Sequence, residues 1–279
     1  MRFERLRRSV GPAATPRISP STTCRAARVS LRFSPTGQVD PCCANDRYVL
    51  GRVGTEPLLD IWASGRRQVL AEALDRADFS LGCQDCGVEN ALGNRLESPA
   101  KEFDDYPDGD AVWPRRLEFA LSNRCNLECL HCNGDLSSTI RARREHLPPL
   151  PKAYDDEFFE QIVPFLEHAE VVTFIGGEPF LAPEARRMWN LLLELDTPPA
   201  VHVTTNGTVW NSRVEQYVYG LRMNAAISID GATAETFEKI RVGASFDRTI
   251  AVRNELMKAT RSYGGAFTIN HCWLVPNWH

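Results

Sequence analysis

SNRCNLECLHCNG, residues 122–134, places Cys125, Cys129 and Cys132 in a CxxxCxxC loop. Three thiolates on one short loop can hold three irons of a cubane 4Fe–4S cluster, because soft sulfur ligands suit iron and sulfide. The fourth iron is then left without a protein ligand and is open to a chelating cofactor. A zinc site completed by His131 or by a distant residue is the alternative that the loop alone leaves open.

An apolar run directly precedes the loop, and apolar strand-like runs alternate with helical patterns from there to the end of the chain. This alternation predicts an α/β fold in which helices cover a parallel sheet and ligands bind at the carboxyl ends of the strands. The expected strands are 117–121, 171–175, 201–205, 225–229 and 267–273. The expected helices are 156–168, with a kink at Pro164, 183–195, 211–219 and 246–262.

A Gly-Gly-Glu-Pro motif, residues 176–179, closes the second of these strands. Its glycines permit close backbone approach, and Glu178 supplies an anion for an ammonium group. Together, the cysteine loop and this motif resemble the signatures of the radical S-adenosylmethionine (SAM) superfamily, and the resemblance runs from about Arg115 to the end of the chain. It implies a partial (β/α) barrel, SAM bound at the open iron, and reductive cleavage of SAM to a 5′-deoxyadenosyl radical that abstracts hydrogen from a substrate.

The resemblance also implies a set of cofactor-binding residues: Gly176, Gly177, Glu178, Asn206, Ser228, Asp230, Arg241 and His131. The Gly-Gly-Glu residues engage the methionine amino group. Asn206, Ser228 and Asp230 offer polar contacts to the ribose and the methionine. The arginine pairs with the SAM carboxylate, and the histidine lies near the adenine. A role in turns explains the polar residues at the strand ends equally well. Arg241 could instead be a solvated surface charge. His131 could lie beside the site without a role in it. No catalytic acid or base is identified, because the cofactor carries the hydrogen abstraction.

A second group of four cysteines lies upstream: Cys24, Cys42, Cys83 and Cys86. Their pattern, C-x12-G-x4-C followed by a CxxC pair, resembles the first half of a SPASM domain or the shorter twitch domain, which are auxiliary modules of radical SAM enzymes. Four thiolates can ligate a whole cubane, so one auxiliary 4Fe–4S cluster is implied. Cys43 is an alternative to Cys42 as a ligand, and a zinc ribbon with four cysteine ligands is the alternative to the cluster. Cys272, in the last expected strand, is predicted to be a buried core thiol.

The run ESPAKEFDDYPDGD, residues 97–110, is short of apolar residues and predicts a linker. We therefore expect a disordered basic N-terminus over 1–20, an auxiliary domain over 21–96 with a helix at 58–74, a linker over 97–112 and a radical SAM core over 113–279. The auxiliary domain precedes the barrel in this chain, whereas it follows the barrel in most members of the family. Because the sequence stops just past the fifth expected strand, we expect the barrel to be truncated after that strand.

The net charge, the lengths of the apolar runs and the number of cysteines exclude some classes of function and favour others. A net charge of −4 and a pI of about 5.9 give no general attraction to nucleic acid or acidic membranes, and no run is long enough to span a membrane. Nine cysteines without an apolar signal segment indicate metal ligands in a cytoplasmic protein. The expected function is a radical SAM enzyme that modifies an unknown peptide or protein and takes electrons from a donor such as flavodoxin or ferredoxin. The alternatives are a small-molecule or sugar-pathway radical SAM enzyme and a non-catalytic zinc or iron–sulfur protein.

Overall fold

An open sheet of eight strands runs through the computed structural model, which describes residues 23–107 and 109–278. The predicted disordered segment 1–20 lies outside the described residues. The strand order is β3-β2-β1-β4-β5-β6-β7-β8, and the five expected strands occur as a parallel run in that order. They are β4 (Arg116–Phe119), β5 (Val171–Phe174), β6 (Ala200–Thr205), β7 (Asn224–Ser228) and β8 (Phe267–Asn270).

The segment before the linker adds three strands that the sequence did not predict. They are β1 (Ser30–Phe33), β2 (Gln38–Asp40) and β3 (Gly51–Arg52). The first lies parallel to β4, with Ser30 opposite Arg116 and Phe33 opposite Phe119, whereas β2 and β3 continue as an antiparallel pair. The N-terminal segment and the barrel strands therefore share one continuous sheet.

The two faces of this sheet differ in polarity because successive side chains of a strand point to opposite sides. One face carries Leu117 and Phe119 of β4, Phe174 of β5 and their neighbours, all buried in a single apolar core that extends from Leu31 to Ala259. The opposite face carries polar side chains at the alternate positions. These are Arg32, Arg116, Glu118, Thr173, His202, Thr204 and Ser228.

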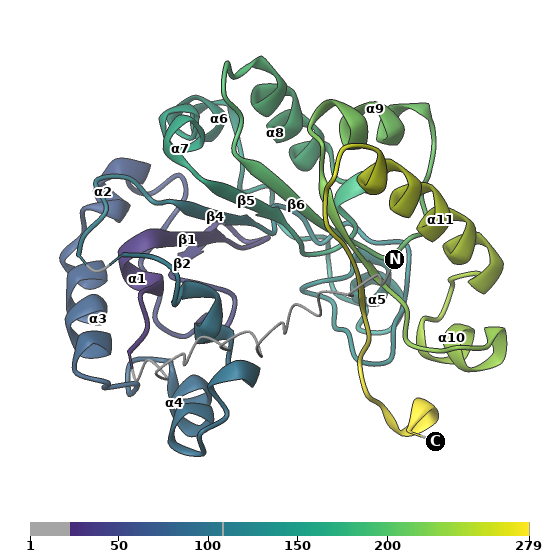
Figure 1. Ribbon diagram of the computed structural model, residues 1–279, viewed down its shortest axis with the longest axis horizontal. Coiled ribbons are helices and arrows are strands. Elements are labelled where there is room, and N and C mark those ends of the chain that lie inside the picture. The colour runs from purple at the N-terminus through teal and green to yellow at the C-terminus, as the bar shows by residue number, and fades with distance from the viewer. Residues whose placement is uncertain (1–22, 108, 279) are drawn as a thin grey trace, which may run out of the picture.

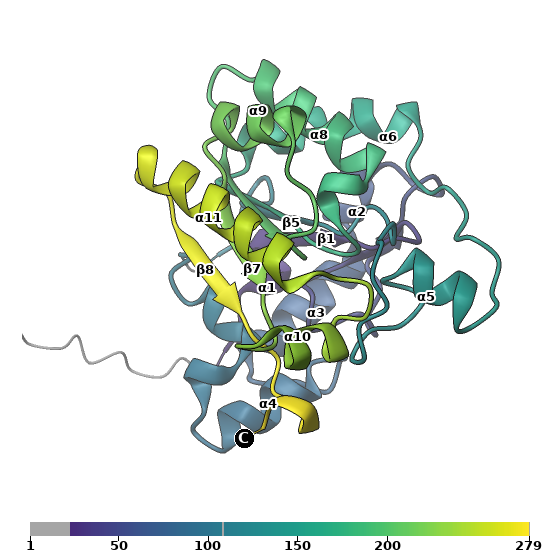
Figure 2. The ribbon, with the colours of Figure 1, turned by 90° about the vertical axis from the view of Figure 1, so that its right-hand side faces the viewer.

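Helices cover the apolar face, and α8, α9 and α11 lie along one side of the sheet (Figure 1). Each contributes buried apolar residues, such as Met188 and Trp189 of α8. The edge strand β8 lies beside α11 (Figure 2). The helices after the cluster loop are α5 (Ser138–Arg143), α6 (Asp156–Gln161), α7 (Val163–His168), η3 (Pro179–Leu181), α8 (Pro183–Glu194), α9 (Ser212–Gly220), α10 (Ala234–Ile240), α11 (Phe246–Ser262) and η4 (Val275–Asn277).

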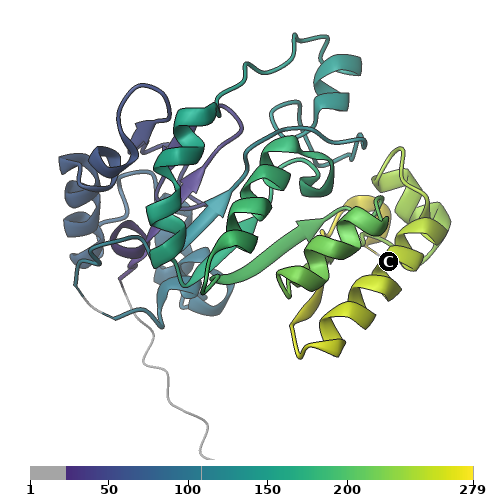
Figure 3. The ribbon, with the colours of Figure 1, turned by 90° about the horizontal axis from the view of Figure 1, so that it is seen from above.

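The helices of the N-terminal segment lie at the other end of the sheet from the C-terminal helices (Figure 3). They bury a second apolar cluster, which includes Val29, Leu70, Leu74 and Phe103. Their bounds are α1 (Ala26–Val29), α2 (Leu58–Trp62), α3 (Gly65–Asp75), α4 (Gln84–Ala91), η1 (Arg95–Glu97) and η2 (Pro99–Phe103). The second 3-10 turn and the last residue of the first lie in the predicted linker.

Three local expectations need correction. The single helix expected at 58–74 is two helices, because the Ser64 hydroxyl accepts a hydrogen bond from the backbone N–H of Arg67 and so begins a new helix there. Leu59 and Val69, for which a helix at 58–74 predicts burial with Trp62 and Leu70, are exposed. The last strand ends at Asn270 rather than at residue 273. The kink expected at Pro164 is confirmed, since α6 ends at Gln161 and α7 begins at Val163.

Candidate metal centres

The cysteine loop leaves the carboxyl end of β4 and is closed by hydrogen bonds across its base. The Asn123 amide donates to the carbonyl of Gly134 at 2.8 Å, and the Ser137 hydroxyl donates to the carbonyl of Leu127 at 2.7 Å. The backbone of Glu128 also bonds to Val242, in the segment that follows α10. These contacts hold Cys125, Cys129 and Cys132 on one curled loop.

The Gly-Gly-Glu turn after β5 packs directly against that loop. The backbone N–H of Glu178 donates to the carbonyl of Arg124 at 2.7 Å, and that of Gly177 donates to Ser122. A Cβ added to Gly177 would lie 2.4 Å from the Arg124 carbonyl oxygen, and Gly176 has a φ of +104°. Only glycines fit this approach of the turn to the backbone of the cysteine loop.

Glu178 itself is fully buried and does not line the cavity beside the loop. Its carboxylate accepts hydrogen bonds from the Thr205 hydroxyl at 2.9 Å, the Asn206 backbone at 2.7 Å and the Phe180 backbone at 3.1 Å. Burial raises the pKa of Glu178 to about 7, against the lowering effect of these donors. The carboxylate therefore anchors the end of β6 to the turn after β5, whereas the sequence suggested a direct contact with the cofactor amino group.

A cavity of about 450 Å³ opens at the carboxyl ends of the strands, in front of the cysteine loop. Most of the predicted cofactor residues meet there, as expected for an edge to which parallel strands converge. The residues that line it and that the sequence singled out are Cys125, Cys129, Cys132, His131, Gly176, Gly177, Asn206, Ser228, Arg241 and Cys272.

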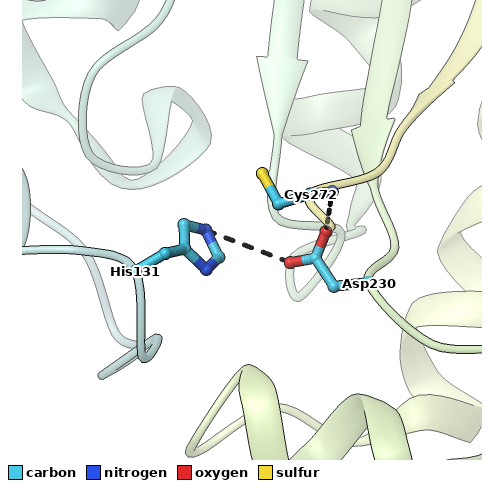
Figure 4. A group of neighbouring side chains, drawn as sticks. All are labelled: His131, Asp230 and Cys272. Carbon is cyan, nitrogen blue, oxygen red and sulfur yellow. Dashed lines mark hydrogen bonds and ion pairs between the residues drawn. The ribbon is translucent and has the colours of Figure 1, made fainter. Parts of the chain in front are cut away.

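Asp230 lies behind the cavity wall and forms a buried ion pair with Arg241 (Figure 4 shows Asp230 with His131 and Cys272). Asp230 Oδ2 is 2.7 Å from Arg241 Nε, at an angle that makes the contact an ion pair rather than an aligned hydrogen bond. His131 Nε2 is 4.0 Å from the same oxygen, and the Cys272 backbone donates to Oδ1. Since Arg241 already balances the carboxylate, we assign no separate cation to this trio.

Two sequence-based interpretations change at this point. Arg241 is buried, so it is not a solvated surface charge, and its Nη1 lies 3.9 Å from Cys129 Sγ. Cys272 is exposed and lines the cavity, so the prediction of a buried core thiol was wrong. The reason is that β8 ends at Asn270, which leaves Cys272 in the segment after the strand, where it lines the cavity.

The four upstream cysteines line a second, mainly apolar cavity together with Leu70, Leu74, Phe79 and Phe103. Cys24 precedes α1 and Cys42 follows β2, whereas Cys83 and Cys86 lie at the start of α4. Cys43 is absent from this cavity and lines the larger one instead. Of the two neighbouring candidates, the structure thus places Cys42 with the other three cysteines.

Burial raises the pKa of most of these thiols. The pKa rises to about 12 for Cys24 and to about 11 for Cys83 and Cys129, where Asn45 and Arg241 respectively oppose the effect of burial. Burial also raises the pKa of Cys125 and Cys132. Metal binding must therefore release protons at both sites.

The spacing of the sulfurs distinguishes a cubane from a single zinc ion. Four sulfurs bound tetrahedrally to zinc at about 2.3 Å lie about 3.8 Å apart. Among the residues that the structure describes, no three of the seven cysteines have sulfurs that all lie within 4.8 Å of one another. Within the described residues the thiols as placed do not form a mononuclear zinc site, and their number and soft chemistry fit a multi-iron cluster.

Two residues of the larger cavity come from the segment before the linker, and the sequence analysis did not place them at this site. Arg32 on β1 and Cys43 after β2 both line it, although they lie before the linker. Arg32 is held by ion pairs to Asp40 at 2.9 Å and Glu118 at 3.1 Å. The alternation of apolar and polar residues over 29–33 was a signal for β1, but its pairing with β4 was not readable from local pattern.

Comparison with protein families gives two matches. The radical SAM superfamily matches residues 119–272, and the SPASM family, described as an iron–sulfur cluster-binding domain, matches residues 24–87. The cofactors that these matches assign are 4Fe–4S clusters and SAM.

Curated relatives resemble about half of this chain. An AdoMet-dependent heme synthase of Methanosarcina barkeri is 30% identical over 148 residues, which cover 52% of this chain and 40% of the relative. The mycofactocin maturase MftC of Mycobacterium tuberculosis is 32% identical over 153 residues, which cover 52% of this chain and 35% of the relative. The chain therefore spans well under half the length of these curated relatives.

Solved structures resemble the chain at lower identity. Streptococcus suis SuiB bound to S-adenosylmethionine is 16% identical with a TM-score of 0.43, over 77% of this chain and 48% of that one. Native anSMEcpe with bound AdoMet is 20% identical with a TM-score of 0.40, over 55% and 42% of the two chains. Within the described residues, none of the helices is both long and apolar enough to cross a membrane.

Proposed function

Because this chain belongs to the radical SAM superfamily, we propose that it is a radical SAM enzyme with one auxiliary 4Fe–4S cluster. When bound and reduced by one electron, the first cluster and SAM supply a 5′-deoxyadenosyl radical that abstracts a hydrogen atom from the substrate. The observation that carries the proposal is the convergence of Cys125, Cys129 and Cys132 with the glycine turn on one cavity at the carboxyl ends of the strands.

The chain's own residues bind and orient the cofactor. The three loop cysteines would hold a cluster through three of its irons, and Gly176 and Gly177 line the same cavity. Asn206 and Ser228 offer polar groups to the ribose and the methionine. Arg241 is available to a carboxylate through the guanidinium edge that Asp230 does not occupy. His131 supplies a flat ring beside the same cavity.

Glu178 acts on the cofactor through the backbone. By accepting hydrogen bonds from Thr205 and Asn206, its carboxylate fixes the strand end from which the Asn206 side chain reaches the cavity. Asn206 also donates to Asn126 in the cysteine loop at 3.1 Å. The proposed role of Glu178 is therefore to position Asn206.

The auxiliary cluster is assigned to Cys24, Cys42, Cys83 and Cys86, which share one apolar cavity. We keep the predicted division into an auxiliary unit over 21–96 and a SAM-binding core over 113–279, although β1 of the first pairs with β4 of the second. The nine free thiols support a reducing, cytoplasmic setting, with flavodoxin or ferredoxin as the class of electron donor.

The first test is anaerobic reconstitution with iron and sulfide, followed by SAM and dithionite and quantification of 5′-deoxyadenosine. The control is the Cys125→Ala, Cys129→Ala, Cys132→Ala variant. Product in the parent protein alone supports the proposal, with iron near ~8 per chain for two cubanes. Bound zinc without iron, and no product, would support the non-catalytic alternative.

A peptide or protein is the proposed substrate, and the maturase relatives support this class. The heme synthase relative and a probable GTP 3′,8-cyclase of Halobacterium salinarum, 23% identical over 139 residues, favour a small molecule instead. To separate the two substrate classes, a deuterated cell extract is divided by filtration into two fractions. The first fraction contains peptides and proteins, and the second contains small molecules. Deuterium transferred to 5′-deoxyadenosine from only the first fraction supports a maturase, and transfer from only the second overturns it.

A further inference from the structure

Asn45 is a buried residue beside the auxiliary cysteines for which neither the sequence motif nor the proposed mechanism has a role. Its side chain is only 1% exposed. The amide nitrogen Nδ2 donates to Cys83 Sγ at 3.0 Å and to the carbonyl of Leu81 at 2.8 Å. The amide oxygen Oδ1 accepts from the backbone N–H of Tyr48 at 3.0 Å. All the polar atoms of the side chain thus have partners.

These partners fix the direction in which the amide points. If the oxygen and nitrogen were exchanged, the oxygen would face the Leu81 carbonyl and the nitrogen would face the Tyr48 N–H, so both contacts would become repulsive. The neighbouring glycine makes room for this arrangement. A Cβ on Gly82 would lie 2.2 Å from Asn45 Oδ1, and Gly82 has a φ of +80°. The N–H donor therefore faces the Cys83 sulfur.

In the described part of the chain, three side-chain nitrogens lie within hydrogen-bond distance of the sulfur of a proposed cluster ligand. The contact from Asn45 to Cys83 is the shortest of the three. Asn206 Nδ2 lies 3.7 Å from Cys125 Sγ, and Arg241 Nη1 lies 3.9 Å from Cys129 Sγ. Asn45 is also tied to a second auxiliary cysteine, because its backbone N–H donates to the carbonyl of Cys42 at 3.3 Å. The closest side-chain donor to a cluster sulfur is thus found at the auxiliary site.

We propose that Asn45 is a positioning residue that raises the reduction potential of the auxiliary cluster by donating a hydrogen bond to the sulfur of Cys83. The inference rests on the proposed function, since it requires a cluster on these four cysteines. Reduction adds one electron, and part of the added negative charge resides on the thiolate sulfurs. A hydrogen bond to such a sulfur stabilises the reduced state more than the oxidised state.

The experiment uses the full chain with Cys125→Ala, Cys129→Ala and Cys132→Ala, so that only the auxiliary cluster gives a signal. Its midpoint potential is measured by an anaerobic redox titration followed by electron paramagnetic resonance. Asn45→Ala removes the donor, and Asn45→Asp keeps an acceptor for Tyr48 but turns an anionic oxygen toward Cys83. We expect the equilibrium constant for reduction to fall about tenfold in Asn45→Ala, equivalent to about 59 mV for one electron, and further in Asn45→Asp.

Gln84→Ala is the matched control, because the Gln84 amide is adjacent in sequence to Cys83 but donates to the carbonyl of Ser80 at 2.7 Å. Its potential is expected to equal that of the background protein. Equal potentials in all four proteins, each with a full cluster, would overturn the inference. If the background protein instead binds no iron, the assignment of the auxiliary cluster fails.

A second measurement needs no substitution at Asn45 and covers the case in which the variants lose their cluster. The background protein is labelled with ¹⁵N in asparagine side chains alone, and its reduced cluster is studied by pulsed electron paramagnetic resonance. We expect a hyperfine coupling to one labelled nitrogen, from the N–H···S contact. A reduced cluster without such a coupling would contradict the proposal.

Discussion

Asp230 and Arg241 form a buried ion pair directly behind the cysteine loop, and the same guanidinium lies 3.9 Å from the sulfur of Cys129. The carboxylate has no solvent exposure, and the arginine side chain is 7% exposed. Removing one partner of such a pair leaves a charge without compensation in a poorly solvated place. The pair therefore links the stability of the fold to the position of a cluster ligand.

Asp230→Asn is predicted to destabilise the protein by about 3 to 5 kcal/mol, because Arg241 remains buried without a counter-charge. Urea unfolding gives the change in free energy. The control is Asp156→Asn, which breaks the exposed ion pair between Arg187 and Asp156 and should cost about 1 kcal/mol or less. Similar decreases in the free energy of unfolding of both variants would show that the buried ion pair stabilises the protein no more than the exposed one.

The raised pKa of Glu178 predicts a pH dependence of stability. Its value of about 7 lies above the ordinary value of 4.5, so the folded protein binds a proton that the unfolded chain has lost. Stability should therefore fall as pH rises between these two values. Between about pH 5.5 and about pH 8 the expected loss is roughly 2 kcal/mol relative to Glu178→Gln, which does not titrate there. Parallel profiles for the two proteins in urea unfolding would refute the linkage.

Gly177→Ala is predicted to displace the cysteine loop, since the new Cβ would meet the Arg124 carbonyl oxygen at 2.4 Å. We expect iron to fall from ~8 toward ~4 per chain as the first cluster is lost and the auxiliary cluster remains. Gly65→Ala is the control, because a Cβ there has open space and lies at the start of α3. Full iron content in the Gly177 variant would contradict the assigned contact.

Cys42→Ser and Cys43→Ser should differ although the residues are neighbours. Cys42 lies in the auxiliary cavity and Cys43 in the cavity of the cysteine loop. We expect the first variant to lose the auxiliary cluster, with ~4 irons remaining, and the second to keep ~8. Iron analysis and the electron paramagnetic resonance spectrum provide the measurement, and the opposite result would exchange the two assignments.

The parallel strands were predictable from sequence because each carries apolar residues at alternate positions and is separated from the next strand by a helical pattern. The expected residues 171–175 and 201–205 match β5 and β6 to within one residue at each end. The convergence of the cysteine loop, the glycine turn and Asn206 was predictable for a related reason, since residues after parallel strands meet at one edge.

The rest depended on contacts between distant segments. Strand β1 has only four residues, and its place beside β4 is set by long-range pairing. For the same reason Arg32 and Cys43 were missed as residues of the larger cavity. The burial of Arg241, at the end of α10, depends on Asp230, which follows β7 and provides its counter-charge. Local pattern contains no information on such partners.

The pairing of β1 with β4 also imposes an order on synthesis. Ser30 leaves the ribosome 86 positions before its partner Arg116 (116 minus 30), a delay of roughly 4 to 17 s at ordinary elongation rates. During this interval the edge of β1 that β4 will cover has no strand to pair with, and Cys42, Cys83 and Cys86 are synthesised after Cys24. The upstream set of ligands is therefore complete before β4 is available to close the sheet.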